Sequence, residues 1–429
     1  MHTVEITLEQ VLLARDRRVQ RQQALHRQYG GTLLSFTMNI AGPVKDTPLV
    51  RLAFRAGLAA LDRDLGAPVH RESVAAPTGP EALLVYHRPA GAVKDLCLRL
   101  EEQAPVGRLY DLDVLSPGGE KLSRPQSRRC LICGGPVTVC SRSRAHGLAA
   151  IQAKTEDILR SFAAGHLAQL ARQALEDEVC LTPKPGLVDR RNSGSHTDMD
   201  TFTFMSSAAS LYPYFEACTR AGRKTADGPA PETFAALRPL GCEAEGEMLA
   251  ATHGVNTHKG AIFSIGIVCA ALGRLDRAVW ADPARVLAEV STMTAGLTAK
   301  DFAGVTAENA VTAGQKLYVQ YGITGVRGQV EAGLPAVLEF GLPALEKGLA
   351  AGYSLNQSGC GALLAIIANS TDTNLIARSD RATQLAVVEE LKALLARTPY
   401  PDEAALCALD DRFIAANLSP GGSADLLAL

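Results

Sequence analysis

Residues 260–273 read GAIFSIGIVCAALG and form the longest apolar run of the chain that contains no charged residue. The run has 14 residues, too few to span a bilayer, so it predicts a helix buried in a globular domain. Around it, apolar side chains recur at helical spacing, and Ala, Leu and Gly are frequent. We therefore predict an all-α domain over residues 161–429. Its candidate helices cover residues 165–180, 201–220, 241–252, 260–275, 283–296, 306–321, 333–350, 358–370 and 380–396.

The first 160 residues alternate between helical and extended patterns. Thr7 and Gln10 form a capping-box signature, which predicts a helix that ends at about Tyr29, before Gly30 and Gly31. The further elements that we expect are strands at residues 33–40, 83–87 and 109–115 and helices at residues 48–65 and 93–103. This order predicts a smaller α+β or α/β domain over residues 1–160, with the domain boundary inside or beside a long helix.

The composition is that of a globular chain, because 47% of the 429 residues are hydrophobic and 21% are charged. Disordered and collagenous classes are excluded, and the length favours two domains. The net charge of −2 is unevenly divided: residues 1–160 carry 22 Lys and Arg against 16 Asp and Glu, and the remainder carries 21 against 29. A basic first domain suits a polyphosphate, a nucleic acid or an acidic protein.

The first ten residues, MHTVEITLEQ, lack the apolar core of a signal peptide. We therefore expect a cytoplasmic protein that does not associate with a membrane. In a reducing cytosol, the ten cysteines of the chain are expected to be free thiols or metal ligands rather than disulfides.

Two aspartates in the sequence RLYDLDV stand on one face of a predicted strand, because Asp111 and Asp113 are two residues apart. Adjacent carboxylates repel each other unless a cation neutralises them, so the pair suits Mg²⁺ bound together with phosphates. The alternative is an exposed strand end. Arg124 and Arg128 follow closely and supply cations for a triphosphate, or form a solvated face. Lys45 ends a Gly-Pro loop that either reaches an active site or is a plain turn.

Three cysteines and a histidine cluster near the end of the first domain. Cys130, Cys133, Cys140 and His146 have the ligand types and the short spacing of a Cys₃His zinc site, and two glycines follow the CxxC pair as in a zinc knuckle. The second half lacks a tight CxxC or CxxH pair, so reduced structural thiols are the alternative.

The second domain begins with polar stretches rich in glycine and proline. Lys184 lies in PKPGLVD, and His196, Asp198 and Asp200 lie in GSHTDMD. The histidine and the two aspartates form a candidate metal or acid–base cluster. Acidic residues that open a helix are also ordinary capping groups.

A second polar stretch precedes the apolar run. Glu243 and Glu247 share a helix face at i, i+4, where like charges disfavour the helix unless a cation lies between them. Asn256, His258 and Lys259 follow in THGVNTHKG, directly before a predicted helix whose amino terminus suits phosphate.

Three later polar stretches interrupt an apolar background. They are GVRG with Arg327, STDTN with Asp372 and Asn374, and NLSPGGSAD at residues 417–425. Polar loops from distant parts of a helical domain usually line one pocket, so we expect these stretches to converge.

Six blocks of the second domain carry a family resemblance. PKPGLVD, GSHTDMD, THGVNTHKGAIFSIG, GVRGQVEAGLP, STDTN and NLSPGGSADLLA occur in this order, and together they resemble the triphosphoribosyl-dephospho-coenzyme A synthases. The first domain resembles the citrate lyase holo-acyl-carrier-protein synthases through LLSFTMNIAGPVK, RLYDLDV and the cysteine-containing tail. The resemblance implies a nucleotidyltransferase-like first domain and a bifunctional transferase.

The resemblance also implies the reactions. The second domain would join ATP and 3′-dephospho-coenzyme A into 2′-(5″-triphosphoribosyl)-3′-dephospho-coenzyme A and release adenine. The first would transfer this group to a serine of the acyl-carrier subunit of citrate lyase and release pyrophosphate. The malonate decarboxylase carrier, which uses the same group, is the alternative partner.

Roles for the candidate residues follow from that chemistry. Mg²⁺ would be bound by Asp111 and Asp113 in the first domain and by Asp198, Asp200, Glu243 and Glu247 in the second. His196 or His258 would move the proton. Phosphates and the remaining substrate groups would be held by Lys45, Arg124, Arg128, Lys184, Asn256, Lys259, Arg327, Asp372 and Asn374.

Two other classes of function remain open. The cysteines and arginines also fit a nucleic-acid binder or an RNA-modifying nucleotidyltransferase, although 5% aromatic residues give few stacking platforms, so we expect no nucleic-acid partner. The second is a hydrolase of N-glycosidic bonds, in which water replaces the ribose hydroxyl. Adenine release from ATP without dephospho-coenzyme A would identify that hydrolase.

Overall fold

The computed structural model describes residues 4–429. The chain divides into two compact units, unit 1 up to Ala163 and unit 2 over Ala164–Leu429. The division falls within the long helix α5 (Leu148–Cys180), the same helix that contains the boundary predicted near residue 160.

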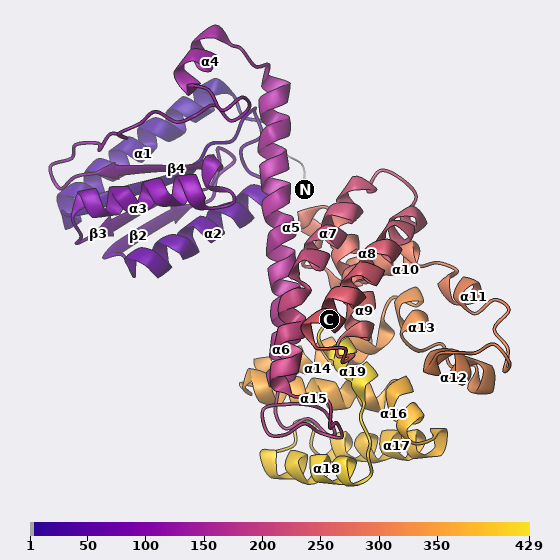
Figure 1. Cartoon of the computed structure of the whole chain (residues 1–429). Coiled ribbons are helices and arrows are strands. Elements are labelled where there is room, and N and C mark those ends of the chain that lie inside the picture. The colour runs from indigo at the N-terminus through magenta and orange to yellow at the C-terminus, as the bar shows by residue number, and fades with distance from the viewer. Residues whose placement is uncertain (1–3) are drawn as a thin grey trace. The chain divides into compact units, whose positions relative to one another are not determined.

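Unit 1 contains an antiparallel four-stranded sheet in the order β2-β3-β1-β4 (Figure 1). Its strands are β1 (Thr32–Met38), β2 (His70–Val74), β3 (Glu81–Tyr86) and β4 (Tyr110–Leu115). Its helices are α1 (Leu8–Tyr29), α2 (Pro48–Leu65), α3 (Ala90–Gln103), the 3₁₀ turn η1 (Gly107–Leu109), α4 (Val137–Ser143) and the first part of α5. The antiparallel pairing makes unit 1 an α+β unit, so the α/β alternative is wrong.

The two faces of the sheet differ in what covers them. One face packs on α2 and α3 through a core that includes Phe36, Phe54 and Leu112. On the other face, Leu33 and Leu83 contact the carboxyl-terminal half of α1. The predicted capping box of Thr7 and Gln10 is confirmed at the start of α1.

The edge strand β2 is the element of the sheet that sequence patterns missed. Its sequence, HRESV, contains no buried residue, because β2 lies at the edge of the sheet. An edge strand of this kind lacks the apolar alternation that identifies a half-buried strand.

Unit 2 consists of helices, and no strand occurs in residues 164–429. After α5 come α6 (Thr201–Ser210), α7 (Tyr212–Lys224), α8 (Ala230–Ala251), α9 (Lys259–Arg274), η2 (Arg277–Val279), α10 (Pro283–Met293), α11 (Leu297–Asp301), α12 (Ala313–Tyr321), α13 (Gly325–Glu331), the π-helical turn η3 (Ala336–Gly341), α14 (Leu342–Ala350), α15 (Leu355–Ala368), α16 (Thr373–Arg378), α17 (Arg381–Arg397), α18 (Glu403–Ala415) and α19 (Gly421–Leu427). The prediction of a helical second domain is therefore confirmed.

The apolar run that opened the sequence analysis forms α9, whose buried residues lie at the centre of the larger core of unit 2. A second core surrounds α15, α17 and α18. Several expected helices were wrong in extent, and the one predicted over residues 241–252 begins at Ala230, as α8. The one predicted over residues 201–220 is divided between α6 and α7, next to Pro213, and only the last part of residues 306–321 is helical, as α12. Within residues 4–429, none of the helices combines the length and the apolar character that crossing a membrane requires.

Candidate functional site

The aspartate pair of unit 1 lies on the sheet face that α1 covers, away from the apolar core. In the register of β1 and β4, Asp111 is opposite Thr37 and Asp113 is opposite Ser35. The side chain of Asp111 is 49% exposed and that of Asp113 is 32% exposed. Asp113 pairs with Lys121 at 2.6 Å (Nζ to Oδ2). Both predicted metal ligands are therefore on one face and open to solvent.

The two arginines that were predicted to hold a triphosphate are anchored by Glu101 of α3, a carboxylate that is only 3% exposed. Arg124 and Arg128 both pair with Glu101. The same carboxylate accepts a hydrogen bond from the backbone N–H of Leu112 on the edge strand β4, at 2.9 Å. Arg128 also lies 3.5 Å from Asp111 (Nη2 to Oδ1). Glu101 thus anchors both arginines, and Arg128 lies beside Asp111. Nothing in the local sequence of Glu101 distinguished it from an ordinary helix residue.

Lys45 occupies the loop between β1 and α2, where its ammonium group donates to the backbone carbonyl of Ile40. Burial lowers the pKa of Lys45. Within residues 4–429, no hydrogen bond or ion pair joins Lys45 to Asp111 or Asp113. In this structure the side chain of Lys45 stabilises the conformation of its own loop.

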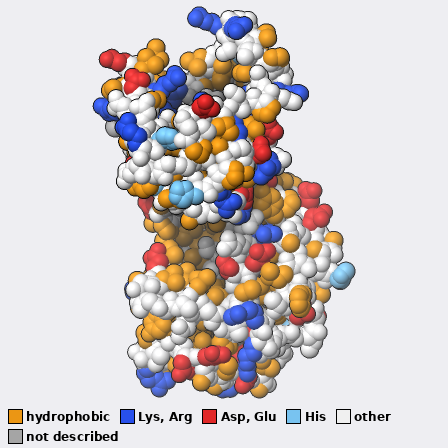
Figure 2. All heavy atoms as spheres, turned by 90° about the vertical axis from the view of Figure 1, so that its left-hand side faces the viewer, with side chains coloured by type: hydrophobic (Ala, Val, Ile, Leu, Met, Phe, Trp, Pro, Cys, Tyr) orange, Lys and Arg blue, Asp and Glu red, His pale blue; other side chains and the backbone are white. Residues whose placement is uncertain are grey.

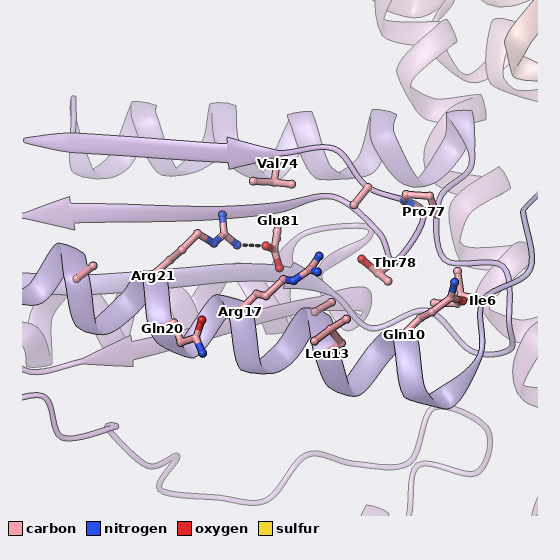
Figure 3. A pocket seen from close by; sticks show the side chains of 13 residues that line it. Ile6, Gln10, Leu13, Arg17, Gln20, Arg21, Val74, Pro77, Thr78 and Glu81 are labelled. Carbon is pink, nitrogen blue, oxygen red and sulfur yellow. Dashed lines mark hydrogen bonds and ion pairs between the residues drawn. The ribbon is translucent and has the colours of Figure 1, made fainter.

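A pocket of about 750 Å³ opens between α1 and the β2–β3 hairpin of unit 1 (Figure 3). Arg17 and Arg21 of α1 line it, and Arg21 pairs with Glu81 of β3. The register places Glu81, Thr37 and Asp111 in one row across three strands. Strands lie about 4.8 Å apart, so Glu81 and Asp111 are separated by about 10 Å. The pocket and the aspartates therefore share one face of the sheet.

Figure 2 shows one face of the molecule, on which the Lys and Arg side chains of unit 1, in the upper part of the view, are interspersed with carboxylates and hydrophobic side chains. Binding a nucleic-acid backbone relies on several basic contacts along its path. The face in Figure 2 does not present such an uninterrupted basic track.

In unit 2, a cluster of charged side chains lies around the amino terminus of α9. Lys184 donates to Glu178 at 2.5 Å (Nζ to Oε1), and these residues are 1% and 6% exposed. Asp425 of α19 accepts a hydrogen bond from the backbone N–H of Ala261 and experiences the charges of Glu178 and Asp372. Four distant stretches of the sequence therefore meet at this helix terminus.

Asp425 has the most perturbed carboxyl group of the cluster. Burial, reinforced by the charges of Glu178 and Asp372, raises its pKa well above the ordinary range. The residue nevertheless keeps some solvent exposure. Its carboxylate packs so closely on α9 that a Cβ atom at Gly260 would lie 2.0 Å from Oδ2. A recessed but accessible carboxyl group with a raised pKa is typical of acid–base sites.

His258 presents an unpaired ring nitrogen beside this cluster. Its Nδ1 lies 2.7 Å from Ser207 Oγ, which in turn accepts from Thr257 at 2.8 Å. This chain of donors places the proton on Nε2, a buried atom with no hydrogen-bond partner among the described residues. Burial and the charge of Lys184 lower the pKa of His258 to about 3. The imidazole is therefore neutral, and Nε2 is its unpartnered atom.

His196 links the GSHTDMD stretch to the carboxyl-terminal block. Its Nε2 lies 2.9 Å from Ser419 Oγ, and Arg378 donates to its Nδ1 at 3.1 Å. Asp198 lies 3.9 Å from Nδ1. Burial and the charge of Arg378 lower the pKa of His196. Both ring nitrogens are thus engaged by the protein.

The four carboxylates predicted to bind Mg²⁺ in unit 2 are not assembled into a site. Asp200 caps α6 by accepting from Thr203 N–H at 2.9 Å, which lowers the pKa of Asp200. Glu243 and Glu247 are exposed on α8. In residues 4–429, Asp198, Asp200, Glu243 and Glu247 do not form a group of three ligands within 4.8 Å of one another. The predicted quartet needs correction, because one member caps a helix and two lie on an exposed helix surface.

Asp372 and Asn374 stand at the start of α16. Asp372 is buried and accepts four hydrogen bonds, from the backbone N–H groups of Asn374, Leu375 and Ser423 and from the Ser423 hydroxyl. Its carboxylate thereby joins α16 to α19. Asn374 is exposed.

The remaining predicted phosphate ligands are divided between exposed and paired positions. Lys259 pairs with Glu245 at 2.7 Å (Nζ to Oε2), and Arg327 pairs with Asp301 at 2.9 Å (Nε to Oδ2). Asn256 is exposed. Lys259 and Asn256 flank the amino terminus of α9, where the charged cluster lies.

Sequence reasoning placed Asp425 in a polar block without giving it a role, and it missed Glu178 and Arg378. Asp425 could have been found as the acidic residue of NLSPGGSAD. Glu178 stands in an ordinary helical pattern, and only its contact with Lys184 gives it significance.

Comparisons with known proteins assign each unit separately. The family model described as CitG, ATP:dephospho-CoA triphosphoribosyl transferase, matches residues 164–429, and that described as CitX, apo-citrate lyase phosphoribosyl-dephospho-CoA transferase, matches residues 6–162.

Curated relatives contain both parts in one chain. This chain is 37% identical to Protein CitXG of Haemophilus influenzae, over 99% of this chain and 95% of that protein. It is 34% identical to Protein CitXG of Leuconostoc mesenteroides subsp. cremoris, over 99% and 96%. It is also 42% identical to a 2-(5″-triphosphoribosyl)-3′-dephosphocoenzyme-A synthase of Pectobacterium atrosepticum, over 61% of this chain and 86% of that protein.

Proposed function

This chain belongs to the family of CitXG fusion proteins, and we propose that its two units make and attach the prosthetic group of citrate lyase in successive reactions. Unit 2 is a transferase that joins ATP and 3′-dephospho-coenzyme A with release of adenine. Unit 1 transfers the product to a serine of the acyl carrier subunit. The observation that carries this assignment is that the two family matches meet at residues 162–164, where the structure divides. Because its substrates are cytoplasmic metabolites, we place both reactions in the cytoplasm.

In unit 2, the ribose 2′-hydroxyl of dephospho-coenzyme A attacks the anomeric carbon of ATP and the bond from that carbon to adenine breaks. The hydroxyl loses a proton, and the departing adenine takes one up. This displacement needs a base for the hydroxyl proton. We assign the base to Asp425, because its raised pKa gives a more basic carboxylate than an ordinary aspartate and the residue keeps some exposure. His258 donates a hydrogen bond from Nε2 to the substrate. Buried Asp372 and the Glu178–Lys184 pair lie close enough to this base to influence its charge.

Mg²⁺ belongs to this reaction as the counter-ion of the ATP triphosphate, whose charge it neutralises. Such an ion commonly takes one or two protein carboxylates and completes its shell with phosphates and water. Of the four predicted ligands, Asp198 fits this requirement best, since its side chain is 62% exposed and lies next to His196. Lys259 and Asn256, at the amino terminus of α9, are placed to contact the phosphates.

In unit 1, the carrier serine attacks the α-phosphorus and pyrophosphate leaves, as in nucleotidyltransferases. Asp111 and Asp113 would hold a Mg²⁺ ion that neutralises phosphate charge, because both carboxylates are partly exposed on one face of β4. Arg128 stands 3.5 Å from Asp111 and neutralises charge on the leaving group. We propose a nucleotidyltransferase-like site on this face, with the α1 pocket beside it.

The test measures adenine release from ATP and Mg²⁺ with and without 3′-dephospho-coenzyme A, followed by addition of the apo acyl carrier subunit. We expect release that depends on the coenzyme and then a mass gain on the carrier equal to the phosphoribosyl-dephospho-coenzyme A group. Release without the coenzyme would identify a glycosidic hydrolase instead. A carrier of malonate decarboxylase, tested in parallel, determines which partner is modified faster.

A further inference from the structure

The segment formed by residues 126–150 of unit 1 has almost no apolar core. Over residues 126–150, Cys130 is the one buried residue, and the segment contains the short helix α4. Apolar burial is the main force that stabilises a folded segment, and small folds without it usually depend on a disulfide or a metal. Some other interaction must therefore hold this segment.

Four ligand atoms meet at its centre. The sulfur atoms of Cys130, Cys133 and Cys140 and a ring nitrogen of His146 all lie within 4.8 Å of one another. The sulfur atoms of Cys133 and Cys140 are 3.5 Å apart. Three thiol groups and one imidazole form the donor set of closed, tetrahedral zinc sites.

The backbone around the first two cysteines is arranged to support a thiolate. The N–H of Ile132 donates to Cys130 Sγ at 3.4 Å, and the N–H of Gly134 donates to the Cys130 carbonyl at 3.1 Å. Gly134 has a positive φ of 72°, which a residue with a side chain rarely adopts. The turn therefore presents both cysteine sulfur atoms to the same side.

The histidine supplies an independent observation that points to a metal ligand. His146 Nε2 is buried and has no hydrogen-bond partner among the described residues. Buried polar atoms almost always have a partner. The left-handed residue Arg144 turns the chain after α4, and Ala145 donates to the Cys140 carbonyl at 3.1 Å, which brings His146 back to the sulfur atoms.

We propose that Cys130, Cys133, Cys140 and His146 bind one structural Zn²⁺ ion. The four protein ligands fill the tetrahedral shell, so the ion leaves no position for substrate and acts on folding alone. Bound zinc would affect the transfer site through the residues that precede Cys130 in the sequence. Arg128 contacts Asp111, and Arg108 donates to the carbonyl of Arg129. Loss of the metal loosens the segment and the placement of Arg128.

The experiment uses the full chain, purified under reducing conditions without chelator. Zinc is measured by plasma mass spectrometry and by release to a chromogenic chelator after mercurial treatment of the thiols. We expect about one zinc per chain, and less than about a tenth of that in Cys133→Ser and Cys140→Ser. Cys242→Ser is the matched control, since Cys242 is exposed on α8, and it should retain the metal.

A second measurement follows the segment itself. Removal of zinc by a chelator, followed by removal of the chelator and restoration of excess Mg²⁺, should speed proteolytic cleavage within residues 126–147 and lower carrier modification, while adenine release by unit 2 stays unchanged. A wild-type chain that takes up no zinc from added zinc chloride would overturn the proposal. This holds whether all ten cysteines react with a thiol reagent or two of them are oxidised to a disulfide. Retention of zinc by Cys133→Ser would overturn it as well.

Discussion

Replacing Lys184 with Met tests whether this residue supports the fold of unit 2 or binds phosphate. Lys184 is 1% exposed and its ammonium lies 2.5 Å from Glu178, which is 6% exposed. Removing one partner of a buried ion pair leaves an uncompensated charge and costs about 3–5 kcal/mol. For a unit of this size, each kcal/mol lowers the melting temperature by about 2–4 °C, so we expect a decrease of about 6–20 °C.

The pH dependence of this loss has a defined sign. Burial raises the pKa of Glu178, and Lys184 opposes that rise. Without the lysine, the pKa of Glu178 rises further, and the protonated carboxyl group needs no counter-charge. The difference in melting temperature between wild type and Lys184→Met should therefore shrink as the pH falls from 8 towards 5.

The assay is differential scanning calorimetry of the full chain, combined with the KM for ATP in adenine release. Lys184→Met with Glu178→Gln is the control, because it removes both charges and should recover most of the lost stability. An unchanged melting temperature together with a raised KM for ATP would refute this reasoning and support the original assignment of Lys184 to phosphate binding.

Three further predictions concern the two sites. Asp425→Asn should lower adenine release by about 10²-fold or more with the fold retained. Because burial raises the pKa of Asp425, the rate of the wild-type enzyme should fall on acidification at a higher pH than it would with an ordinary aspartate. The variant should lack that pH dependence. Asp111→Asn and Asp113→Asn should each abolish the mass gain of the carrier while adenine release stays within about twofold of wild type; an equal loss of both activities would contradict separate sites. Gly260→Ala, whose Cβ would lie 2.0 Å from Asp425, should lower adenine release, whereas Gly246→Ala, whose Cβ meets nothing within 4 Å, should not.

Local patterns in the sequence were sufficient for much of the fold. The apolar run before Gly273 predicted α9, and the alternation around Asp111 and Asp113 predicted β4 and the common face of the two carboxylates. Both inferences depend on periodicity over a few residues. The polar strand β2 was missed because pairing with β3, and not its own sequence, holds it in place.

The site of unit 2 was predicted less well, because whether a side chain is free to bind a substrate depends on partners that are distant in the sequence. The convergence of GVRG, STDTN and NLSPGGSAD was expected, and the hydrogen bond between Asp372 and Ser423 joins the last two. Asp425 also contacts the start of α9, a contact that the sequence did not predict. The spacing of Asp200 and Glu243 could not reveal that one caps a helix and the other lies exposed on α8.

Each unit engages some of its predicted phosphate-binding cations with a buried carboxylate of its own. Glu101 holds Arg124 and Arg128 in unit 1, and Glu178 holds Lys184 in unit 2. A phosphate that approaches Arg128 must compete with Glu101 or share the guanidinium with it, and Lys184 is closed to a phosphate altogether. Such pairs fix the position of a cation before the substrate binds. This helps the cation to orient the substrate more than it strengthens substrate binding. Substrate contacts in unit 2 must then come from groups with unused capacity, and His258 Nε2 is the clearest of these among the described residues.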